Sequence, residues 1–260
     1  MKNNNIIPII EICNIKKNFG SVVALTDVSL SVYNKEVLCL LGDNGAGKST
    51  LIKILSGVFK PDSGNIFYNG NKISFESSKD SIKLGIRTVY QDLAVFPLMS
   101  IADNFFVGSE PTKKFGPFKL LDIKKMHTIA KEGIEKIGVT NVETSRAVKT
   151  LSGGQRQTLA VARAEHLGAK LLILDEPTSA LGVKQASVVL KYINNAKNRG
   201  IGIIFITHNV SHALAIGDRF AILKQGKLDS IYLKSEIKES KLIHLMSGGD
   251  ELEKLKKEIV

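Results

Sequence analysis

The chain has 260 residues, a hydrophobic content of 43% and a formal net charge of +11, which suit a globular protein with a sizeable core. It contains no apolar run near the roughly 20 residues that span a bilayer, and its start, MKNNNIIPII, is too short and too polar for a secretory signal. These properties argue against an integral membrane protein and predict a soluble, cytosolic one.

The charge comes from 36 basic residues, of which only six are arginines. A positive net charge makes nucleic acid or an anionic membrane surface conceivable as a partner. Because proteins that read nucleic acid favour the bidentate contacts of arginine, we expect a solvated, lysine-rich surface and no nucleic-acid partner. Cys13 and Cys39 lie in apolar, strand-like runs, so we expect reduced core thiols rather than a disulfide or a metal site.

Two strands are predicted at the start of the chain, over residues 9–15 and 22–32, with a turn over residues 16–20 between them. Because no helical crossover separates these strands, they should pair in an antiparallel manner. Phe19 lies at the turn, where it either packs against its neighbours or stacks on the ring of a ligand. The local sequence favours neither interpretation.

A strand over residues 37–41, a glycine-rich loop and a helix that begins at Lys48 follow one another directly. The pattern G-x-x-x-x-G-K-S in this setting predicts a phosphate-binding loop rather than a chance glycine-rich turn. Backbone N–H groups and the positive end of the helix would hold phosphates, Lys48 would reach the β- and γ-phosphates, and the Ser49 hydroxyl would ligate Mg²⁺. The predicted phosphate-binding residues are Gly42, Asp43, Asn44, Gly45, Ala46, Gly47, Lys48, Ser49 and Thr50.

The next segments predict a turn over residues 60–64, a strand over 65–70 that ends in an Asn-Gly hairpin turn, and a short helix over 77–85. A buried strand over residues 86–90 follows, and Gln91 stands directly after it. Polar residues at the carboxyl ends of parallel strands face the ligand crevice of an open α/β sheet. Gln91 is therefore either a site residue or an ordinary loop residue.

Residues 92–168 are predicted to be helical, without strands, and to form a subdomain inserted into the α/β core. Helices are expected over residues 101–107 and 122–138, the second with an aspartate cap and a glycine at its end. Residues 111–119 are expected to form a basic, exposed loop.

The sequence LSGGQ precedes the last helix of this block. Ser152 is a favourable N-cap, and Gly153 and Gly154 leave the amides at the helix start bare. Together with Gln155, these residues predict a second anion site of the same physical type as the phosphate loop. Taken alone, this motif carries little weight.

A core strand over residues 170–174 ends in two adjacent acids, Asp175 and Glu176. Buried strands do not end in paired carboxylates without a balancing charge, so two ordinary surface acids are the less favoured interpretation. Asp175 fits a role in binding Mg²⁺, directly or through water. Glu176 fits a general base that polarises the attacking water. A turn over residues 177–182 and a helix over 183–199 follow.

Another apolar strand, over residues 201–206, leads directly to Thr207 and His208. A histidine at this edge of the sheet can hydrogen-bond an oxygen of a γ-phosphate, whereas the other four histidines lie in predicted helices and are expected to be structural. A closing hairpin is predicted over residues 218–223 and 227–233. A helical tail of mixed charge is expected over residues 235–260.

Five features in this order, GDNGAGKST, a glutamine after a strand, LSGGQ, LLILDE and a lone histidine at a strand end, resemble the ATP-binding cassette (ABC) ATPases. The resemblance covers residues 8–233. It implies an α/β fold, a P-loop NTPase (RecA-like) core with an antiparallel β subdomain and an inserted α-helical subdomain. The implied divisions are residues 1–91 and 169–234 for the core and the β subdomain, 92–168 for the helical subdomain, and 235–260 for the tail.

The resemblance also implies roles for single residues. Phe19 becomes the residue that stacks on adenine, although tyrosine is commoner there. Gln91 senses Mg²⁺ and the water and couples to the membrane partner, His208 is the γ-phosphate switch, and the catalytic set is Glu176, His208 and Gln91. Ser49, Gln91 and Asp175 form the Mg²⁺ set.

Members of the family meet head to tail as two cassettes, so the resemblance implies that ATP lies between one phosphate loop and the Ser152-Gly153-Gly154-Gln155 motif of a second copy. The phrases around residues 42–64 and 90–108 are similar to the ribose- and fructose-type sugar importers, and LDEPTSALGVK is similar to the single-cassette members. The implied partners are a second copy of the chain, permease subunits and, indirectly, an extracytoplasmic sugar-binding protein. The implied location is the cytoplasmic face of the membrane.

Two departures from the family pattern stand out. Gly182 occupies a position where aspartate usually helps to join the two cassettes, and Glu165-His166 replaces small apolar residues. Two other functions are open: transport of a substrate other than a sugar, and an ATPase that acts on DNA or ribosomes. The second is disfavoured because residues 92–150 are too few for a coiled-coil insertion and because the chain has one cassette.

Overall fold

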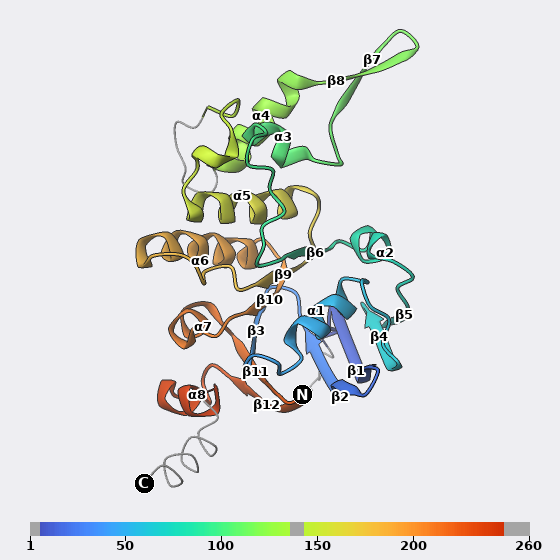
Figure 1. Cartoon of the computed structure of the whole chain (residues 1–260), viewed down its shortest axis with the longest axis vertical. Helices are drawn as coiled ribbons and strands as arrows, with labels where there is room; N and C mark the ends of the chain where they lie inside the picture. The colour runs from blue at the N-terminus through green and yellow to red at the C-terminus, as the bar shows by residue number, and fades with distance from the viewer. Residues whose placement is uncertain (1–5, 136–142, 247–260) are drawn as a thin grey trace.

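The computed structural model describes residues 6–135 and 143–246. The elements follow one another along the chain as shown in Figure 1. They are β1 (Ile10–Phe19), β2 (Val22–Val32), β3 (Val37–Leu41), α1 (Lys48–Leu55), β4 (Ser63–Tyr68), β5 (Asn71–Ile73), α2 (Ser78–Lys83), β6 (Ile86–Val89), α3 (Ile101–Phe106), β7 (Thr112–Phe115), β8 (Phe118–Leu121), α4 (Ile123–Glu135), the 3-10 helix η1 (Val148–Thr150), α5 (Gly153–His166), β9 (Leu171–Asp175), α6 (Val183–Asn198), β10 (Gly202–Ile206), α7 (Val210–Ile216), β11 (Arg219–Lys224), β12 (Lys227–Leu233) and α8 (Glu239–Met246).

A six-stranded sheet with the order β12-β11-β3-β10-β9-β6 forms the centre of the molecule. All neighbours pair in parallel except β12, which closes one edge as an antiparallel hairpin with β11. The non-consecutive order requires crossovers, and the helices supply them, as in other open α/β sheets. This arrangement confirms the predicted α/β core and the closing hairpin.

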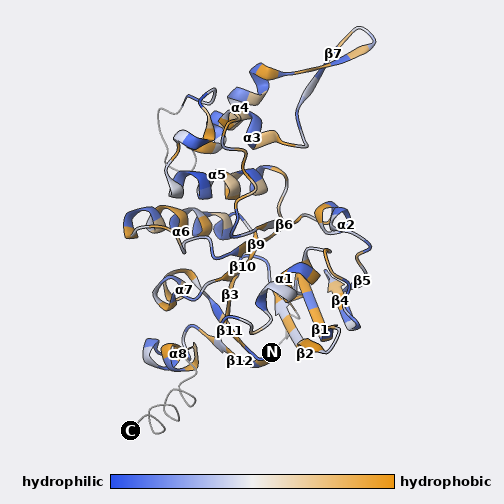
Figure 2. Ribbon diagram, in the orientation of Figure 1, coloured by the Kyte–Doolittle hydropathy of each residue, from blue (hydrophilic) through white to orange (hydrophobic). Residues whose placement is uncertain are grey.

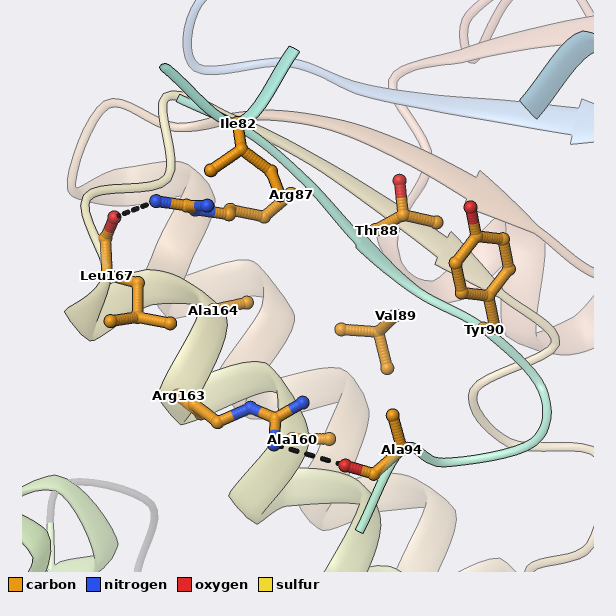
Figure 3. A pocket seen from close by; sticks show the side chains of 10 residues that line it. All are labelled: Ile82, Arg87, Thr88, Val89, Tyr90, Ala94, Ala160, Arg163, Ala164 and Leu167. Carbon is orange, nitrogen blue, oxygen red and sulfur yellow. Dashed lines mark hydrogen bonds between the residues drawn. The ribbon is translucent and has the colours of Figure 1, made fainter. Parts of the chain in front are cut away.

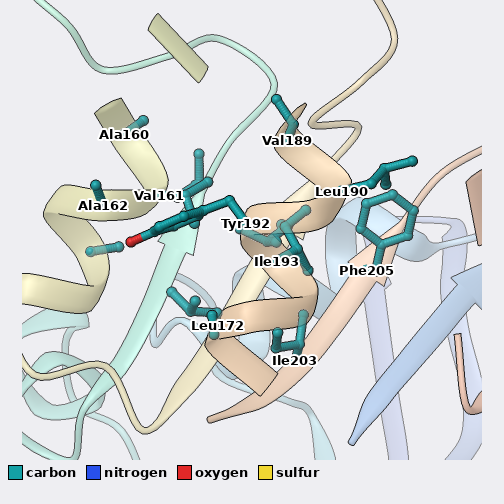
Figure 4. Close-up of a cluster of buried hydrophobic side chains, with 14 of the residues drawn as sticks. Ala160, Val161, Ala162, Leu172, Val189, Leu190, Tyr192, Ile193, Ile203 and Phe205 are labelled. Atoms are coloured by element: carbon teal, nitrogen blue, oxygen red, sulfur yellow. The ribbon is translucent and has the colours of Figure 1, made fainter. Parts of the chain in front are cut away.

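The central strands are apolar along their whole length because both faces of the sheet are covered. Alternate residues enter two different clusters: Leu172 and Leu174 pack with α5 and α6, while Leu171 and Ile173 pack with α1 and the antiparallel strands. Figure 4 shows the first cluster, with Leu172 facing the side chains of α6. The two-residue period of a strand thus divides the core into two layers on opposite faces of the sheet.

The opening strands form a separate four-stranded antiparallel sheet with the order β2-β1-β4-β5. The antiparallel pairing of β1 with β2 is confirmed, but the turn predicted over residues 16–20 is wrong in part, because β1 continues to Phe19 and pairs there with Val22. The hairpin between β4 and β5 turns at Asn69 and Gly70, which both have positive φ, the conformation that favours Asn-Gly. Cys39 is fully buried in β3, as expected of a core thiol, whereas Cys13 is only partly buried in β1; both are free thiols. Burial raises the pKa of the Cys39 thiol above its ordinary range.

Helices α3, α4 and α5 form a block on one side of the six-stranded sheet (Figure 1). The predicted helix start at Asp122 is confirmed, since its side chain accepts a hydrogen bond from the backbone N–H of Lys125 at 3.1 Å. The predicted end at Gly138 lies outside the described residues. Most of the predicted tail does as well; its described part contains α8, with Leu242 and Met246 buried.

The expectation that residues 92–168 contain no strand is wrong. Residues 112–121 form the hairpin β7–β8 rather than a loop, although they are exposed as expected. All eight strand residues of this hairpin are exposed, so neither strand has the alternation of buried and exposed residues from which a strand is predicted.

The pair Glu165-His166 has a structural role. The Glu165 carboxylate accepts hydrogen bonds from the hydroxyl of Tyr192 and the guanidinium of Arg199, and so ties the end of α5 to α6. The ring of His166 packs against Phe105 and Phe106 at centroid distances of 5.1 and 5.3 Å.

Across residues 6–135 and 143–246, no helix has the length and apolar character to cross a bilayer.

Candidate functional site

Three parallel strands bring the phosphate loop, the acid pair and the strand-end histidine to one edge of the sheet. Leu40 of β3 lies beside Ile206 of β10, and Ile206 lies beside Asp175 of β9. The residues that follow these positions begin the phosphate loop, the turn at His208 and the turn at Glu176. Because the carboxyl ends of parallel strands meet at one edge, segments from three distant parts of the chain share one site.

The shape of the phosphate loop requires glycine at its two ends. Gly42 has φ +147° and Gly47 has φ +103°, values that residues with a side chain rarely adopt. A Cβ would lie 2.1 Å from the carbonyl oxygen of Leu223 at Gly42 and 2.7 Å from that of Ala24 at Gly47. In the rest of the loop and the helix start, Asp43, Asn44, Gly45 and Ser49 are exposed, Ala46 is buried and Thr50 is half-buried.

Lys48, the first residue of α1, extends back over the loop. Its Nζ donates hydrogen bonds to the carbonyl oxygens of Gly42 at 2.6 Å and Asp43 at 2.8 Å. Burial lowers the pKa of Lys48, and the nearby carboxylates of Glu176, Asp43 and Asp175 oppose that effect. An ammonium held by neutral carbonyl groups at the positive end of a helix is suited to bind an anion such as a phosphate.

The acid pair stands opposite this lysine. Burial raises the pKa of Asp175, the carboxylate of Glu176 adds to the rise, and Lys48 and Lys53 oppose it. Two acids in one partly buried place are therefore short of positive charge. A divalent cation at this point would relieve that shortage, so the residues present fit the predicted Mg²⁺ site.

Glu176 has an unusual backbone and side chain. Its φ is +49°, a left-handed conformation that costs on the order of 1 kcal/mol for a residue with a side chain. Its Oε1 lies 2.9 Å from Nδ1 of His208. Its Oε2 is buried and has no hydrogen-bond partner among the described residues. One carboxylate oxygen is thus fixed by the histidine, and the other is buried without a partner among the described residues.

The structure places two histidines near Glu176, one more than predicted. The exposed side chain of His208 contacts Glu176 as described. The second histidine is His212 of α7, whose Nδ1 lies 2.9 Å from Oγ1 of the buried Thr178, two residues after Glu176 in the chain. Burial lowers the pKa of His212, the charge of Glu176 opposes the shift, and His208 adds to it. A second histidine four residues after His208 was the only sequence signal for this contact.

Gln91 and Phe19 lie at the edges of the site. Gln91 is exposed two residues beyond Val89, the last residue of β6, which pairs with Leu174 of β9. It therefore follows the strand that neighbours the one carrying the acid pair. Phe19 is 42% exposed and packs edge-on against Phe59 at a centroid distance of 5.2 Å. Phe19 therefore packs against a neighbour and still presents ring surface to solvent, which leaves its predicted stacking on adenine as a prediction.

The LSGGQ motif forms the start of α5. Ser152 and Gln155 make a reciprocal capping box, in which the Ser152 hydroxyl accepts from the Gln155 amide and the Gln155 side chain accepts from the Ser152 amide. A Cβ at Gly154 would lie 3.0 Å from the side chain of Gln185, at the start of α6, so small residues allow α5 to approach α6. Helices α5 and α1 are well separated in Figure 1, so this motif and the phosphate loop of one chain do not form one site.

A cavity of about 190 Å³ lies between α2, β6 and α5 (Figure 3). Two arginines cross it: Arg87 donates to the carbonyl oxygen of Leu167 at 2.7 Å, and Arg163 donates to that of Ala94 at 3.1 Å. The Nε of Arg87 and the hydroxyl of Thr88 are buried without partners among the described residues. The cavity therefore combines apolar walls with unsatisfied polar groups, and its lining includes Tyr90, the residue before Gln91.

Comparisons with known proteins agree with this geometry. A family model described as ABC transporter matches residues 25–179. The chain is 42% identical over 240 residues to a xylose/arabinose import ATP-binding protein of Sulfolobus acidocaldarius, covering 92% of this chain and 94% of that relative. It is 40% identical over 248 residues to a fructose import ATP-binding protein of Rhizobium meliloti, covering 94% and 95%.

Among solved structures, the dimeric structure of a bacterial ABC transporter cassette is similar in fold, with a TM-score of 0.73, 23% identity and coverage of 86% of this chain and 98% of that chain. The family model spans more than half of the sequence, and the two relatives match nearly all of it. A phosphate loop, an acid pair and a strand-end histidine meet at one edge of a P-loop NTPase sheet, and a capped LSGGQ helix lies apart from them. The chain therefore belongs to the ATP-binding cassette family of ABC transporter ATPases.

Proposed function

We propose that the chain is the ATP-hydrolysing subunit of a sugar importer and that ATP binds between two copies of it. The observation that carries the proposal is the side chain of Glu176. One of its oxygens is held by His208, and the other is buried without a partner beside the phosphate loop. A general base needs a free oxygen at the place where the water will lie.

The residues of the chain have separate roles in this proposal. The loop amides and Lys48 bind the phosphates of ATP. Ser49, Gln91 and Asp175 would hold Mg²⁺, which neutralises phosphate charge when it is bound. Glu176 would orient the attacking water through Oε2 and take its proton as the water oxygen bonds to the γ-phosphorus, while the bond from that phosphorus to the β–γ bridging oxygen breaks and leaves ADP and phosphate. His208 holds Glu176 in this orientation and lies where it can hydrogen-bond the γ-phosphate.

A second copy of the chain completes the site. The separation of α5 from α1 (Figure 1) leaves Ser152, Gly153, Gly154 and Gln155 unused within one chain, and the two helix starts are both suited to phosphate. Two copies related by a twofold axis would place each LSGGQ helix over the phosphate loop of the other. A bacterial cassette of similar fold has been solved as a dimer, which supports the pairing of two copies. ATP would favour the closed dimer and ADP the open one, and that difference would drive transport.

Sugar as the transported substrate is supported by the relatives, whose names refer to the import of xylose and arabinose and of fructose. Separate permease subunits would carry the sugar, an extracytoplasmic sugar-binding protein would deliver it, and the cassette would act at the cytoplasmic face of the membrane. The cavity between α2, β6 and α5 is a suitable contact for the permease, because its lining includes Tyr90, the residue before Gln91.

The Glu176→Gln variant tests the proposal. Glutamine keeps the size of the side chain and lacks the basic carboxylate, so ATP should still bind, hydrolysis should stop, and an ATP-bound dimer should accumulate on a sizing column. The matched control is Glu239→Gln, an exposed glutamate of α8, which should hydrolyse ATP at the wild-type rate. Normal turnover by Glu176→Gln would remove the assignment of the general base.

A further inference from the structure

The hairpin β7–β8 is an exposed structure that carries apolar and basic side chains. It projects from the helical block beyond α3 and α4 (Figure 1) and belongs to a two-stranded sheet that pairs with no other described strand. Its phenylalanines Phe115 and Phe118 are 70% and 67% exposed. Large exposed apolar groups that gather in one place mark a surface that contacts something else.

The pairing register decides which side chains lie together. Phe115 is paired with Phe118 across the two-residue turn, and Lys114 is paired with Lys119 in the next position. Directly opposite residues of an antiparallel pair point to the same face, and successive pairs alternate between faces. The aromatic pair at the tip is therefore followed by a pair of lysines on the other face.

The base of the hairpin also combines exposed apolar residues with exposed lysines. Leu120, Leu121 and Ile123 are exposed there. The basic residues from Lys113 to Lys125 are Lys113, Lys114, Lys119, Lys124 and Lys125, all exposed. Asp122 is the one acid in the same stretch, and it caps α4. Figure 2 shows hydrophobic and hydrophilic segments together along this hairpin. We name Lys113, Lys114, Phe115, Phe118, Lys119, Leu120 and Leu121 the hairpin surface.

We propose that the hairpin surface binds an anionic lipid bilayer tip first, with Phe115 and Phe118 at the turn inserted at the level of the headgroups and the lysines behind them, on both faces of the hairpin, on lipid phosphates. Aromatic and aliphatic side chains combined with lysines are the composition of segments that lie in a membrane interface. Long lysine side chains can place their stems along the apolar groups and their charges at the headgroups. The proposal goes beyond the ATPase function and does not depend on hydrolysis.

Charge favours lipid over a protein partner. Cytoplasmic loops of membrane proteins carry an excess of lysine and arginine, which have the same sign as the five lysines of this segment and would repel them. Anionic lipid has the opposite sign, and each lysine near such a surface strengthens binding roughly fivefold at moderate ionic strength. The hairpin would therefore hold the cassette against the bilayer beside its permease.

Flotation of the full chain with two kinds of vesicle tests the proposal. We expect binding to vesicles of phosphatidylcholine and phosphatidylglycerol in equal amounts, and binding at least about tenfold weaker to pure phosphatidylcholine. High salt should weaken the binding to mixed vesicles, since it screens the lysines. The Phe115→Ser/Phe118→Ser variant and the Lys113→Gln/Lys114→Gln/Lys119→Gln variant should each lose more than about tenfold in affinity for mixed vesicles.

Matched controls show whether an effect is specific to the hairpin surface or follows from the loss of any exposed apolar or charged residues. Val22→Ser/Val23→Ser removes two apolar residues of similar exposure, 64% and 60%, from the β1–β2 hairpin. Lys72→Gln/Lys234→Gln/Lys238→Gln removes three exposed lysines elsewhere. Both controls should bind mixed vesicles like the wild type, and the hairpin variants should keep the wild-type melting temperature because they lie off the core.

Three results would overturn the proposal. The first is failure of the wild type to float with mixed vesicles, and the second is equal binding by the hairpin variants and the controls. Recruitment only to membranes that contain a permease, with no binding to pure lipid, would assign the hairpin to a protein contact instead. These outcomes do not depend on the ATPase proposal. Glu176→Gln, which should not hydrolyse ATP, should bind vesicles as strongly as the wild type.

Discussion

Glu176 combines a left-handed backbone with a buried, unpaired oxygen, and both features cost stability in the absence of a ligand. Strained, unsatisfied groups of this kind concentrate at functional sites. Glycine adopts a positive φ freely, whereas alanine does not. We therefore expect Glu176→Gly to unfold in urea with a free energy about 1 kcal/mol higher than Glu176→Ala. Equal stabilities would show that the backbone at this position is relaxed.

His212 makes the stability of the site dependent on pH. Burial lowers the pKa of His212 in the folded protein, so the unfolded chain binds more protons than the folded chain in acid. Its contribution to the free energy of unfolding should be complete above the ordinary histidine pKa of about 6.5 and should be lost as the pH falls through the lowered pKa. Urea titrations at neutral and mildly acidic pH should show a smaller loss of stability on acidification in His212→Gln than in the wild type. Identical losses in the two proteins would contradict this role.

Substitution of Gly182 tests whether glycine, at a position where the family usually has aspartate, weakens the dimer. It caps α6 without a side-chain hydrogen bond, and the space around its Cβ position is open, so aspartate would fit without strain. In the Glu176→Gln background, Gly182→Asp should increase the fraction of ATP-bound dimer on a sizing column. Gly182→Ala fills the same space without a carboxylate and should leave that fraction unchanged. The same effect from alanine and aspartate would rule out a charge-based contact.

At the scale of elements, the contact between α5 and α6 is held by a polar cluster inside an apolar core. Glu165 accepts from the hydroxyl of Tyr192, which is buried beside Val161 and Leu172 (Figure 4). Glu165→Ala would leave that hydroxyl unpaired, so we expect a loss of about 1–3 kcal/mol in the free energy of unfolding. In a double-mutant cycle, Glu165→Ala should lower the free energy of unfolding by less when Tyr192 is already replaced by phenylalanine. Additive effects would show that the two groups do not interact.

The elements themselves differed in how well the sequence predicted them. The central strands and the glycine-rich loop between β3 and α1 were predicted correctly because their apolar runs and glycines reflect constraints close in sequence. The hairpin β7–β8 was missed because both of its faces meet solvent and its burial has no period of two. The partners of Glu165 and His212 were missed because tertiary packing brings together residues that are far apart in sequence. No local sequence pattern predicts such contacts.

At the scale of the whole molecule, the central claim is that each ATP site is built from two copies of the chain. The phosphate loop, Asp175, Glu176 and His208 meet at one edge of the sheet, and the LSGGQ helix of the same chain lies apart from them (Figure 1). The sequence alone predicted each motif, and the family resemblance supplied the second copy. The fold explains why a second copy is needed.

Mixing two inactive variants measures this claim most directly. Lys48→Ala should disable the phosphate loop, and Ser152→Arg should block the LSGGQ motif. In a mixed dimer, one site combines the intact phosphate loop of the Ser152→Arg copy with the intact motif of the Lys48→Ala copy. Random pairing in equal amounts should therefore restore about a quarter of wild-type ATPase activity if the two sites turn over independently. A mixture no more active than the two variants measured separately would contradict the shared site.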